Sequence, residues 1–263
     1  MKSIKNTLIA LVAFAGLAGV AVSADDSAVH NKQVDWSFNG PFGTIDKQSA
    51  QRGFQVYREV CSSCHSLKYF KFRNLADLGY GNDMIKAFAA EYTVAGDIDS
   101  FGDPTERAGL PQDAFPSPFA NDNAARASNG GALPPDLSLV AKSRADGPNY
   151  LYSLLTGYDD APSGVELGEG MSYNAYFPGN QIAMAEPIFD DHVEYSDGTA
   201  ATQDQIAKDI SMFLMYVAEP KLDARHTMGL NVMLFLLVLT IIFYLSMKKI
   251  WAPVKRGDNI IGD

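Results

Sequence analysis

The only two cysteines of this 263-residue chain stand three residues apart, and a histidine follows the second: Cys61, Cys64 and His65. Two thiols at this spacing can form thioethers with the two vinyl groups of one haem, and the adjacent imidazole then reaches the iron on the same face. The pattern therefore predicts one haem c per chain, bound covalently through Cys61 and Cys64, with His65 as an iron ligand.

A Cys-x-x-Cys pair also occurs in redox-active dithiol enzymes and in zinc sites. A dithiol enzyme needs a thioredoxin-like pattern of strands and helices, and the sequence around Cys61 lacks it. A zinc site needs two further ligands at suitable spacing, and the chain has no other cysteine. The pattern therefore favours haem attachment over a redox-active dithiol and over a zinc site.

The N-terminal residues have the pattern of a secretory signal peptide. Lys2 and Lys5 precede an apolar stretch over 8–22 that is rich in Ala and Gly, and small residues follow at 22–24. This arrangement predicts a signal peptide over 1–24 that is cleaved after Ala24. An uncleaved anchor helix is the alternative.

A second apolar segment, Met228 to Met247, contains no charged residue and can cross a hydrocarbon core of about 30 Å. Basic residues follow it at once, at 248, 249, 255 and 256, which predicts a cytoplasmic C-terminus. The expected organisation is a periplasmic domain over 25–227, a transmembrane helix over 228–247 and a cytoplasmic tail over 248–263, in a bacterial inner membrane. A buried core helix is the alternative for the apolar segment.

The spacing of apolar residues predicts a mainly α fold with long loops. Helices are expected over 47–60, 149–156 and 202–218, the last opened by a capping box at Thr202. Its buried face is expected to contain Ile206, Ile210, Phe213, Leu214 and Val217. An irregular arm is expected over 25–45, and Gly- and Pro-rich loops over 97–136 and 159–199.

The chain is acidic, with 21 Lys and Arg against 31 Asp and Glu and a formal net charge of −10. Residues 25–227 alone contain 15 basic and 29 acidic residues, which gives a net charge of −14. This charge excludes nucleic acid as a natural partner and favours a basic protein.

The sixth iron ligand decides between electron transfer and ligand chemistry. Met184 is the best candidate, because Pro178, Gly179 and Pro187 flank its loop and its small Ala neighbours let the backbone approach a flat haem face. A packing role for Met184 stays open at this point. The other candidate sulfur ligands are Met84 and Met171, since Met212 and Met215 suit helix packing, Met1 belongs to the signal peptide, and the remaining methionines fall in the apolar span.

Several segments together resemble the cytochrome c1 family, the haem c subunits of ubiquinol–cytochrome c reductase (bc1) complexes. The resemblance runs from about Trp36 through the C-terminal anchor. The matching segments are 51–57 (Gln-Arg-Gly-Phe-Gln-Val-Tyr), 60–66 around the cysteines, 129–138 (Asn-Gly-Gly-Ala-Leu-Pro-Pro-Asp-Leu-Ser), 150–158, 182–184, and Glu219-Pro220-Lys221 with Arg225.

The resemblance implies roles for individual residues. Met184 matches the axial methionine, so His65 and Met184 are the expected iron ligands, and Arg126 matches an arginine that contacts a haem propionate. Tyr57 and Pro135 are expected to pack near the haem. In c-type folds the helix that enters the attachment motif crosses the C-terminal helix of the domain, and Gly53 suits a close crossing.

Two departures from the family pattern are visible. Glu186 stands where many relatives have a neutral residue, and a carboxylate there would lower the reduction potential slightly if it were not exposed. Some bacterial relatives also carry a second cysteine pair. This chain has none, so its loops from Asn149 to Met171 are expected to be held by packing alone.

The implied function is a relay of single electrons from a Rieske iron–sulfur protein to a soluble, basic cytochrome c. The chain would then be an electron carrier with no catalytic residue of its own, and an enzyme only as a subunit of the reductase. Its implied partners are cytochrome b and the Rieske protein in a dimeric membrane complex. The alternatives are an anchored cytochrome c outside that complex, or a haem enzyme or gas sensor with an open sixth site.

Overall fold

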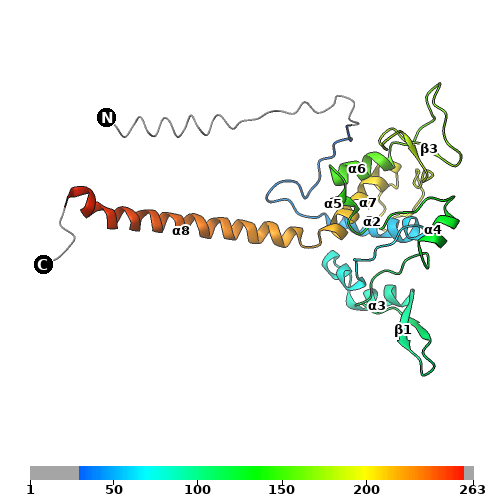
Figure 1. Cartoon of the computed structure of the whole chain (residues 1–263), viewed down its shortest axis with the longest axis horizontal. Coiled ribbons are helices and arrows are strands. Elements are labelled where there is room, and N and C mark those ends of the chain that lie inside the picture. The colour runs from blue at the N-terminus through cyan, green and yellow to red at the C-terminus, as the bar shows by residue number, and fades with distance from the viewer. Residues whose placement is uncertain (1–29, 258–263) are drawn as a thin grey trace. The chain divides into compact units, whose positions relative to one another are not determined.

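The computed structural model describes residues 30–257, so the predicted signal peptide and the last residues of the predicted tail lie outside the described part. The fold is mainly helical, as predicted, and Figure 1 shows the helices α2, α5, α6 and α7 gathered together. Short 3-10 helices, η1 (Cys61–Ser63) and η2 (Phe72–Leu78), follow the first of these helices.

Helices α2 (Lys47–Glu59) and α7 (Gln203–Ala218) confirm two of the predicted helices almost to the residue. Asp46 caps α2 by accepting hydrogen bonds from the backbone N–H groups of Gln48 and Ser49. Thr202 caps α7 in the same way through Gln205 N, at 3.2 Å. The capping box is only half formed, because the Gln205 side chain donates instead to Asp209.

The close crossing of α2 and α7 at Gly53 is confirmed. A Cβ atom on Gly53 would lie 2.0 Å from the backbone oxygen of Asp209 and 2.7 Å from Cβ of Phe213. Beside this contact the fully buried Asp209 carboxylate accepts hydrogen bonds from Ser49 Oγ at 2.7 Å and Arg52 Nε at 2.8 Å. The crossing therefore depends both on the missing side chain of Gly53 and on a satisfied buried charge.

The α7 face that packs against α2 is the one that the periodicity predicts, and all five of its expected residues are buried. Phe213 lies 5.6 Å from Phe54 and 6.0 Å from Tyr57 between ring centroids. Phe115, from the following loop region, lies 5.9 Å from both α2 rings. These rings form an aromatic cluster around the second half of α2, the helix that leads into the cysteine motif.

The remaining helices of the domain are short. They are α3 (Asn82–Ala90), α4 (Asp122–Ser128), α5 (Val140–Ser143) and α6 (Gly147–Leu155). Helix α6 confirms the helix predicted over 149–156, beginning two residues earlier at Gly147. A Cβ on Gly147 would lie 1.8 Å from the backbone oxygen of Ala141, so α5 and α6 meet at a glycine as α2 and α7 do.

The prediction of loops over 97–136 is wrong in part. Strands β1 (Thr93–Ile98) and β2 (Pro104–Ala108) form an antiparallel hairpin in which Thr93 pairs with Ala108, and α4 lies in the same range. The hairpin is largely exposed, so it lacks the alternation of apolar and polar residues by which a half-buried strand is recognised. A second, two-residue pair, β3 (Ser172–Tyr173) with β4 (Gln181–Ile182), lies in the other loop-rich region.

The irregular arm before α2 is confirmed for its described part, and it packs along α6. Trp36 Nε1 donates to Asn149 Oδ1 at 2.7 Å, and Lys32 N donates to Ser153 Oγ at 2.8 Å. Asn149 and Ser153 are buried polar side chains one helical turn apart, so α6 supplies the acceptors that the arm needs.

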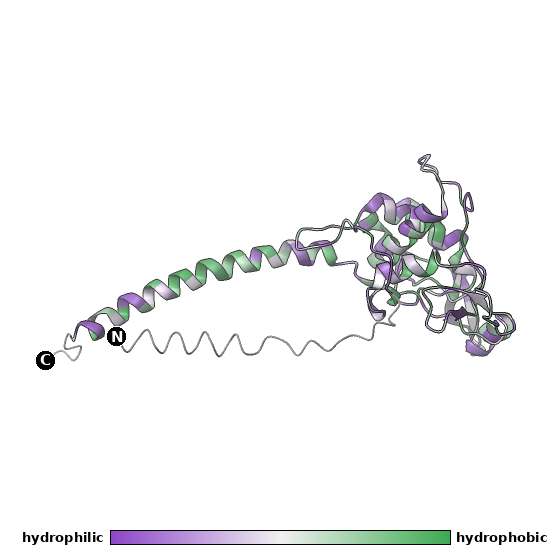
Figure 2. Cartoon of the chain, turned by 90° about the horizontal axis from the view of Figure 1, so that it is seen from above, coloured by the Kyte–Doolittle hydropathy of each residue, from purple (hydrophilic) through white to green (hydrophobic). Residues whose placement is uncertain are grey.

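Helix α8 (Leu222–Arg256) contains the predicted apolar span and extends beyond both of its ends. It is the helix, among residues 30–257, that is long and apolar enough to cross a membrane, and Figure 2 shows its apolar stretch in green. Its apolar side chains are exposed, and Leu222 at its start is buried. This exposure excludes the alternative of a buried core helix.

We expect Gly53→Ala to lower the free energy of unfolding by about 1–3 kcal/mol or more, because the added methyl group forces α2 and α7 apart. Chemical denaturation followed by circular dichroism measures the effect. Gly81→Ala is the matched control, since a Cβ at Gly81 meets no atom within 4 Å. An equal effect of both substitutions would contradict the importance of the crossing.

Candidate haem-attachment site

The two cysteines and His65 lie on one tight turn directly after α2. The backbone N–H groups of Cys64 and His65 both donate to the carbonyl oxygen of Cys61, at 3.2 and 2.9 Å. Both thiols are free and half-buried. Burial raises the pKa of the Cys61 thiol to about 12, whereas a redox-active dithiol needs a lowered pKa. The turn thus suits attachment better than thiol–disulfide exchange.

The imidazole of His65 is oriented by a backbone carbonyl. Its Nδ1 lies 2.8 Å from the oxygen of Pro135, and because a carbonyl oxygen only accepts, Nδ1 must carry the proton. Burial lowers the pKa of His65, which favours the neutral ring. In that tautomer Nε2 carries the free lone pair, and it is therefore the atom available to a metal.

Asp136 clamps the segment that follows His65. Its Oδ2 accepts hydrogen bonds from Ser66 Oγ and Lys68 N, both at 2.8 Å, and Leu137 N donates back to Ser66 O at 2.9 Å. Burial alone would raise the pKa of Asp136, but these donors and Ser138 lower it, so the carboxylate is ionised at neutral pH. These hydrogen bonds hold Pro135 beside the attachment turn, so that its carbonyl oxygen can accept the hydrogen bond from His65.

Tyr57 lies on the inner side of this turn. Its ring is fully buried, with 1% of its surface exposed, and its hydroxyl donates to the backbone oxygen of His65 at 3.1 Å. Burial raises the pKa of Tyr57, so the phenol stays protonated and remains a donor. The structure therefore brings Tyr57 and Pro135 together beside His65, from two segments nearly 80 residues apart.

Met184 lies in the loop that follows β4, and it is half-buried. Its backbone oxygen accepts a hydrogen bond from the hydroxyl of Tyr158 at 3.1 Å, and Ile182, two residues earlier, is buried. The loop is thus held at Ile182 by burial and at the Met184 carbonyl by one hydrogen bond. Sequence reasoning missed Tyr158 as a functional residue, although the residue ends one of the segments that carry the family resemblance.

Three other methionines of the domain lie in different parts of the fold. Met212 is buried in α7 and packs in the core, as its helical spacing predicts. Met84 is half-exposed on α3, and Met171 lies in the loop before β3. None of these three makes a hydrogen bond through its side chain within residues 30–257.

The Arg126 side chain forms no hydrogen bond with the His65 turn or with the Met184 loop in the part of the chain that the structure describes. It lies exposed on α4, and its Nη1 donates to the backbone oxygen of Gly131 at 3.0 Å. This bond ties the helix to the start of the segment 129–138 that supplies Pro135 and Asp136. Its contact with a propionate stays a prediction.

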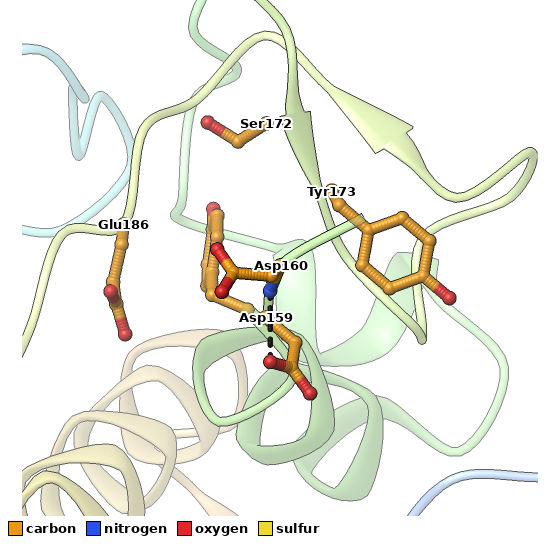
Figure 3. Close-up of a pocket in the computed structure, with 6 residues that line it drawn as sticks. Asp159, Asp160, Ser172, Tyr173 and Glu186 are labelled. Carbon is orange, nitrogen blue, oxygen red and sulfur yellow. Dashed lines mark hydrogen bonds between the residues drawn. The ribbon is translucent and has the colours of Figure 1, made fainter. Parts of the chain in front are cut away.

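A polar cavity of about 350 Å³ lies next to the Met184 loop, lined by Tyr158, Asp159, Asp160, Ser172, Tyr173 and Glu186 (Figure 3). In Figure 3, Glu186 lies across the cavity from Asp159 and Asp160. This acidic lining does not suit the apolar face of a haem. The Glu186 carboxylate is exposed and accepts from Gln203 Nε2 at 2.6 Å, so water and the amide screen it and its expected effect on a reduction potential is small.

The loops between α6 and β4 are not held by packing alone, which corrects that expectation. The buried Asn174 donates through Nδ2 to Leu154 O at 2.8 Å, and Ala175 N donates to Gly157 O at 2.9 Å. Gln181 Oε1 accepts from Gly168 N at 3.0 Å. The side-chain amides of Asn174 and Gln181 therefore help to hold these loops, and amide residues have no spacing in the sequence that would reveal such a role.

The donor set of these residues fits a covalently attached haem. Two adjacent thiols, an imidazole with Nε2 available, and a thioether on an anchored loop are the groups that a Met/His c-type haem requires. Zinc is a poorer match, because residues 30–257 contain no group of three or more His, Cys, Asp or Glu side chains arranged to hold a metal ion.

Comparison with known proteins agrees with the residue-level resemblance. The sequence model of the cytochrome c1 family matches residues 36–254. Cytochrome c1 of Rhodospirillum rubrum is 47% identical, over 96% of this chain and 98% of that protein. The cytochrome b-c1 complex catalytic subunit of Candida albicans is 46% identical over 90% of this chain and 82% of its own length. Cytochrome b/c1 of Bradyrhizobium diazoefficiens is 42% identical over 95% of this chain, but over only 40% of that longer protein.

We expect Tyr158→Phe to cost about 1 kcal/mol of stability and to weaken the absorption band of methionine–iron ligation, because the Met184 carbonyl loses its donor. Thermal unfolding and the visible spectrum of the oxidised protein measure the two effects. Tyr173→Phe is the control, since this ring lines the same cavity without a hydrogen bond to Met184. An unchanged spectrum in Tyr158→Phe would show that the hydroxyl does not support the ligand.

Proposed function

The chain belongs to the cytochrome c1 family, and on that premise we propose that it is the haem subunit of a bc1 complex. It would accept single electrons from a Rieske iron–sulfur protein and pass them to a soluble cytochrome c. The observation that carries this proposal is the His65 turn, in which Pro135 and Asp136 set the ring with Nε2 available beside two free thiols. As a subunit it takes part in a quinol–cytochrome c reductase, while the chain itself is an electron carrier.

One haem c is the proposed cofactor, bound through Cys61 and Cys64, with His65 and Met184 as iron ligands. When bound, it supplies the single-electron ferric–ferrous couple, and methionine ligation favours the ferrous state. The chain's own residues fix the ligands. Pro135 holds the tautomer of His65, and Tyr158 holds the Met184 backbone.

Tyr57 and Arg126 have supporting roles in the proposal. The buried Tyr57 closes the inner side of the His65 turn against water, and its hydroxyl satisfies a carbonyl that would otherwise be unpaired. The exposed Arg126 can turn its guanidinium from the Gly131 carbonyl toward a propionate, for which it is a strong charge-assisted donor.

The charge distribution supports a basic electron acceptor. Six acidic residues of the domain are all exposed: Asp97, Asp99, Glu166, Glu169, Asp190 and Asp191. Exposed carboxylates of one sign steer a basic protein toward the domain and raise its association rate. The domain therefore attracts a Lys-rich cytochrome c through long-range electrostatics.

The proposed setting is a bacterial inner membrane, with the haem domain in the periplasm and the C-terminus in the cytoplasm. Helix α8 supplies the span, and the basic residues after Met247 support this orientation. The relative named cytochrome b/c1 supports cytochrome b as a partner. The Rieske protein and a dimeric complex complete the proposed assembly.

We expect Met184→Leu to lower the reduction potential by on the order of 0.1 V or more while the haem stays attached, because a thioether ligand is lost. Redox titration measures the shift, and Met171→Leu is the matched control. Carbon monoxide should bind the ferrous Met184→Leu protein and hardly bind the parent. An unchanged potential would identify another residue as the ligand, and ready binding to the parent would favour an open-site haem enzyme.

The complex itself is tested by purifying the tagged full-length chain from its membrane. We expect a di-haem cytochrome b and a Rieske protein to co-purify, and the preparation to reduce a basic cytochrome c with quinol as donor. The second-order rate should fall as ionic strength rises, because salt screens exposed charges beyond about 8 Å. Purification without these partners would favour a carrier outside the complex, and a rate independent of salt would exclude electrostatic steering.

A further inference from the structure

Residues 37–44, called here the arm loop, form a closed loop between the arm and α2. Its ends are joined twice, because Thr44 N donates to Ser37 O at 3.0 Å and Ser37 Oγ donates to Thr44 O at 2.8 Å. A Cβ on Gly43 would lie 2.3 Å from the backbone of Phe38, so only glycine permits this tight return. The loop therefore holds a defined shape.

This loop presents an apolar side chain to its surroundings. Phe38 points inward and stacks on Trp36 with ring centroids 5.7 Å apart, whereas 73% of Phe42 is exposed. No charged residue occurs between Asp35 and Asp46, although the domain as a whole is strongly acidic. The arm loop thus presents one exposed aromatic ring on a stretch of the sequence that carries no charge.

Two hydrogen bonds fix the level of the arm loop along α8. His226 Nδ1 lies 2.7 Å from Gly43 O, and Ile45 N donates to Asp223 Oδ1 at 2.9 Å. The apolar span begins at Met228, two residues after His226, which is a distance of about 3 Å along the helix axis. Figure 1 shows the blue arm beside the beginning of α8.

The thickness of a bilayer determines what lies at that level. The apolar run of α8 matches a hydrocarbon core of about 30 Å, and the headgroup layer adds roughly 5–7 Å on each side. His226, and with it Gly43, must then lie in the headgroup layer. Aromatic side chains are enriched there, since they place an apolar ring at the acyl boundary.

We propose that the arm loop contacts the lipid surface and that Phe42 enters the boundary between headgroups and acyl chains. The partner is the bilayer around α8, and the inference rests on the proposed membrane anchor. A lipid contact beside α8 opposes tilting and rotation of the haem domain about this helix.

The test places a nitroxide label at three positions of the full-length haem protein in lipid vesicles, one position at a time. The variants are Phe42→Cys, Leu236→Cys in the middle of the span, and Phe101→Cys. Phe101 is the matched control, because 89% of it is exposed at the tip of the β1–β2 hairpin among aspartates. The native cysteines carry the haem and do not react with the label.

Electron paramagnetic resonance then compares collisions of each label with oxygen, which concentrates in lipid, and with a water-soluble nickel complex. We expect the oxygen-to-nickel ratio at position 42 to be several-fold above that at 101 and below that at 236. A ratio at 42 equal to that at 101, with 236 lipid-exposed, would overturn the inference and leave the anchor intact. Protection of position 42 from both reagents would also overturn it, in favour of a protein contact. A water-exposed label at 236 would refute the anchor itself.

Discussion

The crossing of α2 and α7 is the constraint on which the rest of the domain depends. Helix α2 ends directly in the Cys61 turn, and α7 is followed after three residues by α8. The crossing therefore connects the helix that leads into the attachment turn with the helix that precedes the membrane span. Glu219, at the end of α7, forms ion pairs with Lys142 at 2.5 Å and with Arg225 at 3.2 Å, which link this end of α7 to α5 and α8.

The two proposed iron ligands are supported unequally. The His65 turn is held by Pro135, Asp136 and Tyr57, so its ring orientation follows from several hydrogen bonds between segments distant in sequence. Met184 has one tether at its carbonyl, and its side chain carries no polar atom that could be fixed in this way. Substitutions around His65 should therefore disturb the whole attachment turn. Substitutions around Met184 should disturb only the binding of its sulfur to the iron.

The sequence allowed prediction of those features that depend on local spacing. Helical periodicity and the residues that end helices predicted α2, α6 and α7, and the attachment motif identified the Cys61–His65 turn as the candidate haem site. The sequence showed no sign of the β1–β2 hairpin, whose strands are largely exposed. Nor could it show the roles of Tyr158 and Asn174, because each acts on a backbone group that only the folded chain brings near. The family resemblance predicted Pro135 near the haem, but it did not predict the hydrogen bond between Pro135 and His65, which joins residues 70 positions apart.

Charge and membrane contact act together in the proposed arrangement. A bilayer surface with anionic lipids repels a domain whose net charge is −14, most strongly within a Debye length. Repulsion turns the acidic loops away from the membrane, toward the solution in which a basic partner diffuses. The arm loop carries no charge, so this repulsion does not act on it and it can approach the lipid. The same charge that attracts the acceptor thus helps to orient the domain, while Phe42 and α8 supply the two fixed points about which it is oriented.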